Sequence, residues 1–200
     1  MRIAKDGSLQ LYYSRENAVD DQDSIQRISH DDGATWGEII AFSGHGILAR
    51  DGMLGLAEFR DEVVAVFETN EDGPMHIKAI TSPGAYNDPS LLVVSQLIFP
   101  DDGKTWHNRH LVYRAINGVA AAPQIAKCGG VLVINFQTDE DGQGTCMKTL
   151  CGRPGNWHSK VEIGPPASQW GGIMALDEFN AVALFDHEGC KTRRIFLREV

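Results

Sequence analysis

Short apolar segments of five to eight residues recur along the chain, and polar turns rich in glycine separate them. Many of these segments alternate apolar and polar positions or concentrate β-branched and aromatic residues, as β-strands do. No segment longer than ten residues carries apolar residues at helical spacing. The pattern therefore predicts an all-β chain with strands at residues 8–14, 24–29, 38–42, 52–59, 62–69, 75–82, 121–127, 131–138, 145–150, 172–176, 181–185 and 193–198.

One turn between two of these strands has a distinctive sequence. Residues 29–36 read Ser-His-Asp-Asp-Gly-Ala-Thr-Trp. We expect the carboxylate of Asp31 to accept hydrogen bonds from backbone N–H groups of the turn, and Gly33 can adopt a positive φ without steric cost. Trp36 would then begin the next strand and pack back across the hairpin.

The same turn recurs twice further along the chain. Residues 101–106 repeat its second part as Asp-Asp-Gly-Lys-Thr-Trp, and an eroded third copy ends at Trp157. The tryptophans of the three turns, Trp36, Trp106 and Trp157, lie 70 and then 51 residues apart. Repeats of a few tens of residues are typical of solenoids and propellers, and a propeller blade takes about 40–50 residues.

Residues 83–99 interrupt this repeat. Removing them joins Ser82 to Pro100, which restores a complete turn sequence, Ser-Pro-Asp-Asp-Gly-Lys-Thr-Trp. The first tryptophan spacing then falls from 70 to 53 residues (70 − 17), close to the second spacing of 51. We interpret residues 83–99 as an insertion between a strand and its own turn, either a true loop or a retained intron. The alternative is an ordinary strand at residues 91–99.

The turn at residues 29–36 resembles the Asp-box of sialidase-like β-propellers. Five further segments resemble, in the same order along the chain, glycoside hydrolase family 93, the exo-acting arabinanases, and their sialidase-like relatives. The resemblance implies a retaining glycosidase on a six-bladed propeller. The five segments are Arg50-Asp51-Gly52-Met53, Val66-Phe67-Glu68-Thr69, Ala122-Pro123-Gln124-Ile125, Phe136-Gln137-Thr138-Asp139-Glu140-Asp141 and Gln169-Trp170-Gly171-Gly172.

The length of the chain fits only part of such a propeller. Six blades of about 45 residues need roughly 270 residues. Without residues 83–99 this chain has 183 residues (200 − 17), which suffices for about four blades. We therefore expect residues 1–200 to form one incomplete propeller domain, as in a truncated member of the family or an inactive fragment of one, because missing blades would supply part of the pocket wall.

Two glutamates are the candidate catalytic residues. A retaining glycosidase works with two carboxyls about 5–5.5 Å apart, one as nucleophile and one as acid/base. The resemblance implies these roles for Glu68 and Glu140. Each follows an apolar strand, at what we take to be equivalent points of neighbouring blades, and equivalent strand ends converge on the propeller axis. Burial there would raise the pKa of a carboxyl. The alternative is that both are solvated loop acids.

Three further residues are candidate substrate contacts. Arg50 and Asp51 resemble the family's substrate-contacting loop, although an aspartate beside Gly52 is also typical of an ordinary turn. Trp170 offers either a ring face for a sugar or an apolar group for the core. The arginine triad and the Phe/Tyr-Arg-Ile-Pro motif of true sialidases are not recognisable in this sequence. The function alternatives are therefore an exo-arabinanase, a non-catalytic propeller that binds glycan or protein, and an exo-sialidase.

Composition excludes several other classes. The net charge of −9 disfavours nucleic acid as a partner, because phosphate binding requires a basic face. No apolar run approaches the ~20 residues that span a bilayer.

We expect a monomer that binds an oligo- or polysaccharide without cofactor or metal. By family resemblance we expect it to work outside the cell, although no signal peptide begins this chain.

The four cysteines leave two alternatives open. Cys128, Cys146, Cys151 and Cys190 match no zinc-binding spacing. Cys146 and Cys151 could form a disulfide across a hairpin, or the cysteines could be buried free thiols, which the sequence favours.

Overall fold

The computed structural model describes residues 1–60, 62–83 and 102–198 of the chain, and within them it contains β-strands and no α-helix. The prediction of an all-β chain is confirmed. None of the described residues forms a helix that could cross a membrane. The strands are β1 (Arg2–Ile3), β2 (Leu9–Ala18), β3 (Asp21–Ser29), β4 (Ile40–Ser43), β5 (Gly52–Phe59), β6 (Glu62–Thr69), β7 (His76–Pro83), β8 (His107–Tyr113), β9 (Ala120–Cys128), β10 (Val131–Thr138), β11 (Cys146–Arg153), β12 (Asn156–Gly164), β13 (Gln169–Ala175), β14 (Asn180–Asp186) and β15 (Cys190–Phe196).

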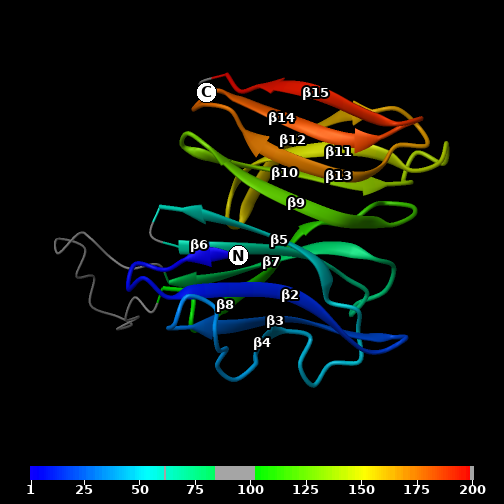
Figure 1. Cartoon of the computed structure of the whole chain (residues 1–200). Coiled ribbons are helices and arrows are strands. Elements are labelled where there is room, and N and C mark those ends of the chain that lie inside the picture. Colours follow the sequence, from blue (N-terminus) through cyan, green and yellow to red (C-terminus); the bar gives the residue numbers. More distant parts are fainter. Residues whose placement is uncertain (61, 84–101, 199–200) are drawn as a thin grey trace.

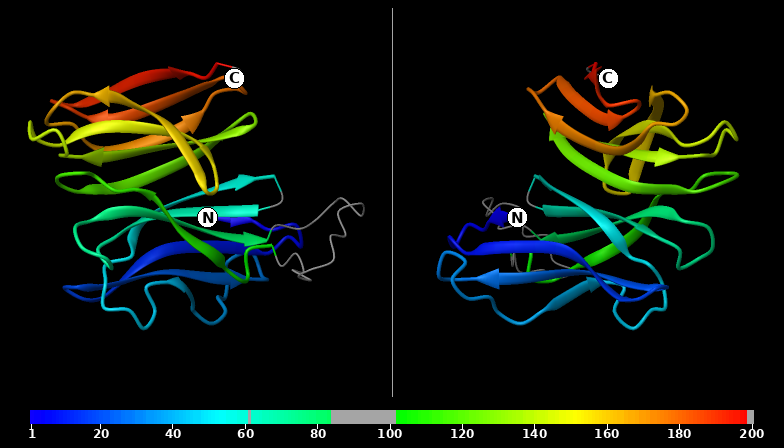
Figure 2. Two further views of the ribbon diagram at one scale, coloured as in Figure 1. Left: turned by 180° about the vertical axis from the view of Figure 1, so that it is seen from behind. Right: turned by 45° about the vertical axis from the view of Figure 1, so that its right-hand side comes forward.

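These strands form four antiparallel sheets, each made of strands that are consecutive in the sequence. We call them blade 1 (β1–β4), blade 2 (β5–β8), blade 3 (β9–β12) and blade 4 (β13–β15). The first strand of blade 3, β9, packs against β5 and β6 of blade 2 and against β13 of blade 4. Figures 1 and 2 show the sheets following one another in chain order through the molecule. First strands that meet side by side while the other strands lead outward are typical of propeller blades.

Two of the outer strands were not predicted by the sequence pattern. β8 and β12 are the fourth strands of blades 2 and 3. Most of β12 is exposed, and only its last two residues are buried. An edge strand with water on both faces shows neither alternation nor a continuous apolar run, because neither face has to be apolar.

Aromatic and branched side chains fill the spaces between blades. Phe67 of blade 2 belongs to a cluster that includes Tyr12 and Phe42 of blade 1. The indole of Trp106 stacks on the Phe42 ring at a centroid distance of 4.5 Å. Phe136 lies in a second cluster, which joins blades 2 and 3 and is fully buried at its centre. Each blade is therefore held by its neighbours, as expected for a sheet that cannot cover both faces alone.

The three turns that carry tryptophans occupy equivalent places. Trp36 and Trp106 lie in the connection from the third to the fourth strand of blades 1 and 2, and Trp157 is the second residue of the fourth strand of blade 3. The prediction that Trp36 and Trp106 hold matching blade positions is therefore confirmed. We call the ends of the blades where these turns lie the tryptophan rim.

Asp31 organises the first of these turns. Its carboxylate accepts the backbone N–H of Thr35 at 2.8 Å, the hydroxyl of Thr35 at 2.5 Å and the hydroxyl of Ser29 at 2.8 Å. These hydrogen bonds, led by that of the Thr35 hydroxyl, lower the pKa of Asp31 to about 2. Gly33 has a φ of 87°, as its place in the turn requires. The corresponding Asp101 lies outside the described residues.

The expected insertion and the state of the cysteines are the two remaining predictions about the fold. Residues 84–99 of the expected insertion lie outside the described residues, so the insertion stays a prediction. All four cysteines are free. The alternative of a disulfide between Cys146 and Cys151 is wrong, because both lie on β11 rather than on opposite strands of a hairpin. Cys128 and Cys146 are buried as expected, whereas Cys190 is exposed.

Gly55 lies where the backbones of blades 2 and 3 approach closely. A Cβ atom on Gly55 would lie 3.1 Å from the Cα of Gln124 and 3.1 Å from the backbone nitrogen of Ile125. We expect Gly55→Ala to lower the free energy of unfolding by about 1–3 kcal/mol, because backbone cannot move aside as a side chain can. Urea denaturation measures this. The control is Gly130→Ala, whose Cβ would meet no atom within 4 Å; equal loss in both variants would contradict the tight contact.

Candidate functional site at one rim of the blades

The five predicted site residues lie at the rim opposite the tryptophan turns. Arg50 and Asp51 immediately precede β5, and Trp170 is the second residue of β13. Glu68 is the last residue but one of β6, and Glu140 follows the end of β10. First strands begin and second strands end at this rim, because the strands of each blade are antiparallel. We call it the Glu68 rim.

The first strands of blades 2, 3 and 4 are all distorted at this rim. Met53, Ala122 and Trp170 have φ angles of 49°, 49° and 52°. The pairing register shifts beside each of them. Such bulges re-aim side chains and backbone groups, and left-handed non-glycine residues are concentrated at functional sites. The repeated distortion therefore marks this rim as the candidate site.

Glu68 contacts the distorted strand of blade 3 at Ala122. Its Oε2 atom accepts the backbone N–H of Ala122 at 2.7 Å, across the boundary between blades 2 and 3. Only 8% of Glu68 is exposed. Burial raises the pKa of the Glu68 carboxyl, although the Ala122 hydrogen bond and the charge of Arg50 act against it. A carboxyl of this kind can hold a proton at a pH where an exposed glutamate has lost it.

Arg50 lies beside Glu68 and is held by blade 1. Its Nη1 atom donates to Oε1 of Glu16 at 2.6 Å and to the carbonyl of Val19, and its Nη2 atom lies 3.4 Å from Oε2 of Glu16. Its backbone N–H donates to Oδ1 of Asn70 at 2.8 Å. The hydrogen bond from Arg50 lowers the pKa of Glu16.

Asp51 and Trp170 differ in their access to solvent. Asp51 is fully buried, and its Oδ2 atom accepts hydrogen bonds from Ser43 at 2.5 Å and Arg109 at 2.6 Å. Its Oδ1 atom is buried without a hydrogen-bond partner among the described residues. The side chain of Trp170, by contrast, lies at the surface, since 62% of the residue is exposed. The role of either residue in binding a substrate stays a prediction.

Glu140 is held as an ionised carboxylate. Its Oε1 atom accepts the ammonium groups of Lys148 at 2.5 Å and Lys160 at 2.8 Å, and Oε2 accepts the hydroxyl of Tyr113. Burial opposes ionisation of Glu140, but the hydrogen bonds of Lys148, Lys160 and Tyr113 outweigh it and lower the pKa to about 2. The two predicted catalytic glutamates therefore have opposite protonation preferences.

The strand register corrects the expectation that Glu68 and Glu140 are equivalent. Glu68 pairs with Gly52 and Ile77 near the end of β6, and the corresponding residue near the end of β10 is Gln137. Gln137 repeats the contact of Glu68, since its Oε1 atom accepts the backbone N–H of Trp170 at 3.2 Å.

The equivalent of Glu140 in blade 2 is instead Glu71. Each of these glutamates lies in the loop from the second to the third strand of its blade, and each binds a lysine of the third strand, Lys78 or Lys148. Each also binds a cation of the fourth strand, Arg109 or Lys160. The ion cluster around Glu140 is thus a repeated feature of the fold, and whether Glu140 also takes part in catalysis stays a prediction.

Sequence reasoning missed Glu16. It lies near the end of β2, the second strand of blade 1, and its contact with Arg50 reaches the start of blade 2. By strand register the residue of blade 1 that corresponds to Glu68 is Ser14, which pairs with Ser24 as Glu68 pairs with Ile77, so Glu16 is not the equivalent of Glu68. No local sequence pattern marks Glu16, because its contact with Arg50 depends on the packing of blades 1 and 2.

One group of side chains has the composition of a metal site. Ligand atoms of Asp141, Cys146 and Glu162 lie within 4.8 Å of one another. The Lys148 ammonium already binds Asp141 at 2.5 Å, and burial raises the pKa of the Cys146 thiol. A metal would have to displace that ammonium and the thiol proton, so these residues do not fit one well.

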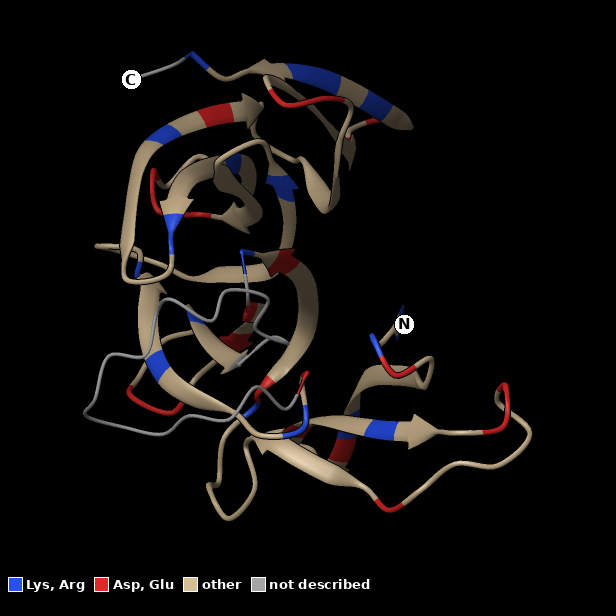
Figure 3. Cartoon of the chain, turned by 90° about the vertical axis from the view of Figure 1, so that its left-hand side faces the viewer, with Lys and Arg blue, Asp and Glu red and all other residues tan. Residues whose placement is uncertain are grey.

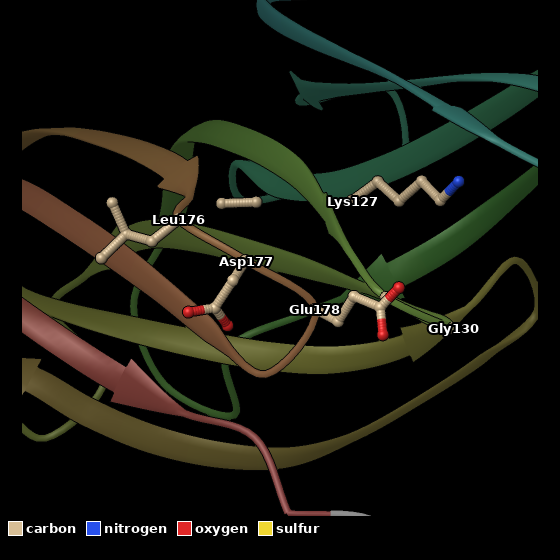
Figure 4. Close-up of a pocket in the computed structure, with 7 residues that line it drawn as sticks. Lys127, Gly130, Leu176, Asp177 and Glu178 are labelled. Carbon is tan, nitrogen blue, oxygen red and sulfur yellow. The ribbon is translucent and has the colours of Figure 1, made fainter.

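A cavity of about 440 Å³ lies at the tryptophan rim. The turn from β9 to β10 and the turn from β13 to β14 line it with Lys127, Asp177 and Glu178, and Figure 4 shows these side chains around it. It lies away from Glu68, and the hydrogen bonds of Phe179 and Asn180 lower the pKa of Asp177, which lines it. The Glu68 rim therefore remains the better candidate site.

No protein-family profile and no curated protein sequence matches this chain. Solved structures do match. A Hadza microbial sialidase aligns with a TM-score of 0.68 at 12% identity, over 96% of this chain and 42% of the sialidase. An ulvan lyase, a polysaccharide lyase bound to a glucuronate–rhamnose sulfate repeat, aligns with a TM-score of 0.61 at 13% identity, over 95% of this chain and 50% of the lyase.

An α-L-arabinanase of Penicillium chrysogenum, solved with arabinobiose, aligns with a TM-score of 0.58 at 15% identity, over 97% of this chain and 65% of the arabinanase. This chain spans about half the length of the sialidase and the lyase. At such identities the likeness establishes the fold, which is that of the sialidase-like β-propellers.

Proposed function

We propose that this chain belongs to a glycan-processing enzyme, an exo-acting retaining glycoside hydrolase of the arabinanase type. The observation that carries the proposal is Glu68, a buried carboxyl with a raised pKa at the Glu68 rim, beside the Arg50 guanidinium and on the rim where Trp170 is exposed. A carboxyl that keeps its proton is what a glycosidase needs as general acid. The likeness of the fold to sialidases and an arabinanase supports the same class.

The opposite pKa shifts assign the roles within this proposal. Glu68 donates its proton to the glycosidic oxygen as the bond from that oxygen to the anomeric carbon breaks. Glu140, which is ionised above a pH of about 2, supplies the carboxylate that bonds to the anomeric carbon. Glu68, now deprotonated, then removes a proton from the water that hydrolyses this intermediate.

Of the remaining predicted residues, Arg50 and Trp170 bind the substrate in this proposal, and Asp51 has a supporting role. Arg50 donates hydrogen bonds to sugar hydroxyls, and the exposed face of Trp170 packs against a sugar ring. Asp51, which is buried, orients the Arg109 guanidinium and thereby supports the loop that carries Arg50.

Incubation with defined glycans tests the proposal. We expect release of short arabinose oligomers from arabinan with retention of configuration, measured by proton NMR, and no release of sialic acid from sialyl-lactose. Binding of arabinan without turnover would favour the non-catalytic alternative or an inactive fragment of a longer enzyme. Release of sialic acid would favour the exo-sialidase alternative, and inversion of configuration would contradict the retaining mechanism.

A further inference from the structure

Several cations at the described part of the Glu68 rim are engaged by carboxylates. Arg50 is paired with Glu16 at 2.6 Å, and Arg15 of the same blade boundary is paired with Asp23 at 2.6 Å. Arg109 contacts Asp51 and Glu71. Figure 3 shows acidic and basic positions interspersed along the chain.

The lysines of this rim show the same pairing. Lys78 binds the carboxylates of Glu71 and Asp72 at 2.7 and 2.8 Å. Lys148 and Lys160 both bind Glu140. None of these named cations at the described part of the rim is left with its charge uncompensated.

The carboxylate of Glu16 compensates the positive charge of the Arg50 guanidinium. Two hydrogen bonds join the carboxylate of Glu16 to the guanidinium of Arg50, and the lowered pKa of Glu16 keeps that carboxylate ionised at neutral pH. Recognition of a carboxylate by arginine depends on free, paired N–H donors and an uncompensated positive charge. At Arg50, Glu16 already occupies that place.

A pair of this kind suits neutral sugars. The Arg50 guanidinium keeps further N–H donors, and Glu16, with 53% of its side chain exposed, keeps acceptor lone pairs. Neighbouring hydroxyls of a neutral sugar can donate to the carboxylate and accept from the guanidinium. A sugar carboxylate would instead meet the negative charges of Glu16 and, when ionised, of Glu68.

We propose that Glu16 is a specificity-determining residue that holds Arg50 beside Glu68 and makes the site select neutral glycans over glycans that carry carboxylates. The inference rests on the proposed function, since it concerns the sugar that enters the same site. It separates this chain from the acidic-sugar specificity that the names of the sialidase and the ulvan lyase state for those proteins.

Isothermal titration calorimetry on the whole chain tests the proposal. The probes are an arabinose oligomer, which is neutral, and a galacturonate oligomer of the same length, which is anionic. We expect the wild-type chain to bind the neutral probe more tightly. In Glu16→Gln the affinity for the anionic probe should rise roughly tenfold, as expected when one charge-assisted hydrogen bond becomes available.

Two further variants identify the source of the change. Adding Arg50→Gln to Glu16→Gln should abolish the gain in affinity for galacturonate. The matched control is Glu58→Gln, because Glu58 is also an exposed partner of an arginine, Arg2 at 2.7 Å, but belongs to the part of β5 nearest the tryptophan rim. This control should change neither affinity. Thermal melting verifies that each variant is folded.

The outcomes separate the two proposals. Tighter binding of galacturonate than of the arabinose oligomer by the wild type, or no gain in Glu16→Gln, overturns the role of Glu16 while sugar binding at the site stands. Failure of the wild type to bind either probe overturns the proposed function, and the role of Glu16 with it.

Discussion

Replacing Lys148 with methionine should lower the free energy of unfolding by about 3 kcal/mol, because removal of one partner leaves a buried carboxylate with too little compensation. The side chains of Lys148 and Glu140 are 7% and 5% exposed, and Lys148 also binds Asp141 at 2.5 Å. The value lies at the low end of such effects, since Glu140 keeps Lys160 and Tyr113. A loss of this size is a large part of the total stability of a small domain.

Lys160→Met is the matched control, because Lys160 binds the same oxygen of Glu140 but is 39% exposed. We expect this variant to lose about 1 kcal/mol or less, as exposed ion pairs do. Urea denaturation at pH 7 measures both variants. Equal losses would contradict the buried ion cluster.

The pH dependence of stability follows from the same cluster. The folded-state pKa of Glu140 is lowered from its ordinary 4.5 to about 2. The stability that this carboxylate contributes is therefore present above about pH 4.5 and is lost as the pH falls toward 2. In Lys148→Met the acid-induced loss that Glu140 causes should be smaller and should be complete at a higher pH, since the folded-state pKa of Glu140 is then lowered less.

Replacing Glu68 with glutamine should reduce turnover of a glycan substrate by about a hundred- to ten-thousand-fold, the usual contribution of a general acid/base. Affinity for the substrate should change little, because Arg50 and Trp170 remain. Glu58→Gln, with 61% of the Glu58 side chain exposed, is the control and should keep full turnover. Unchanged turnover in Glu68→Gln would show that Glu68 is not the acid/base.

The fold should tolerate this substitution. Gln137 holds the equivalent place in blade 3 and accepts the N–H of Trp170, so an amide at residue 68 can accept the N–H of Ala122. The folded-state pKa of Glu68 is raised. The stability linked to its proton is thus present at low pH and is lost as the pH rises through that pKa. At neutral pH we therefore expect Glu68→Gln to melt at the same or a higher temperature than the wild type.

The sequence predicts those parts of this fold that depend on burial. The strands that became β5, β6 and β10 carry the longest apolar or alternating runs, and their predicted bounds match the structure. The edge strand β12 was missed because its exposed faces impose no pattern.

The candidate site, like the fold, could be predicted from local sequence only in part. A glutamate that ends an apolar strand is visible in a single stretch of sequence, and this identifies Glu68. The equivalence of Glu68 with Gln137 depends on strand register, which pairing across the sheet determines. The contact between Glu16 and Arg50 joins residues 34 positions apart and depends on the packing of two blades.

The central claim is that the Glu68 rim binds a glycan, and NMR mapping of the isotopically labelled chain with an arabinose oligomer tests it most directly. The account predicts shifts of the backbone amides of Arg50, Ala122 and Trp170, together with a change in the pH titration of the Glu68 carboxyl carbon. Shifts confined to the opposite rim, around Gly129 and Glu178, or no shifts at saturating sugar, would contradict it.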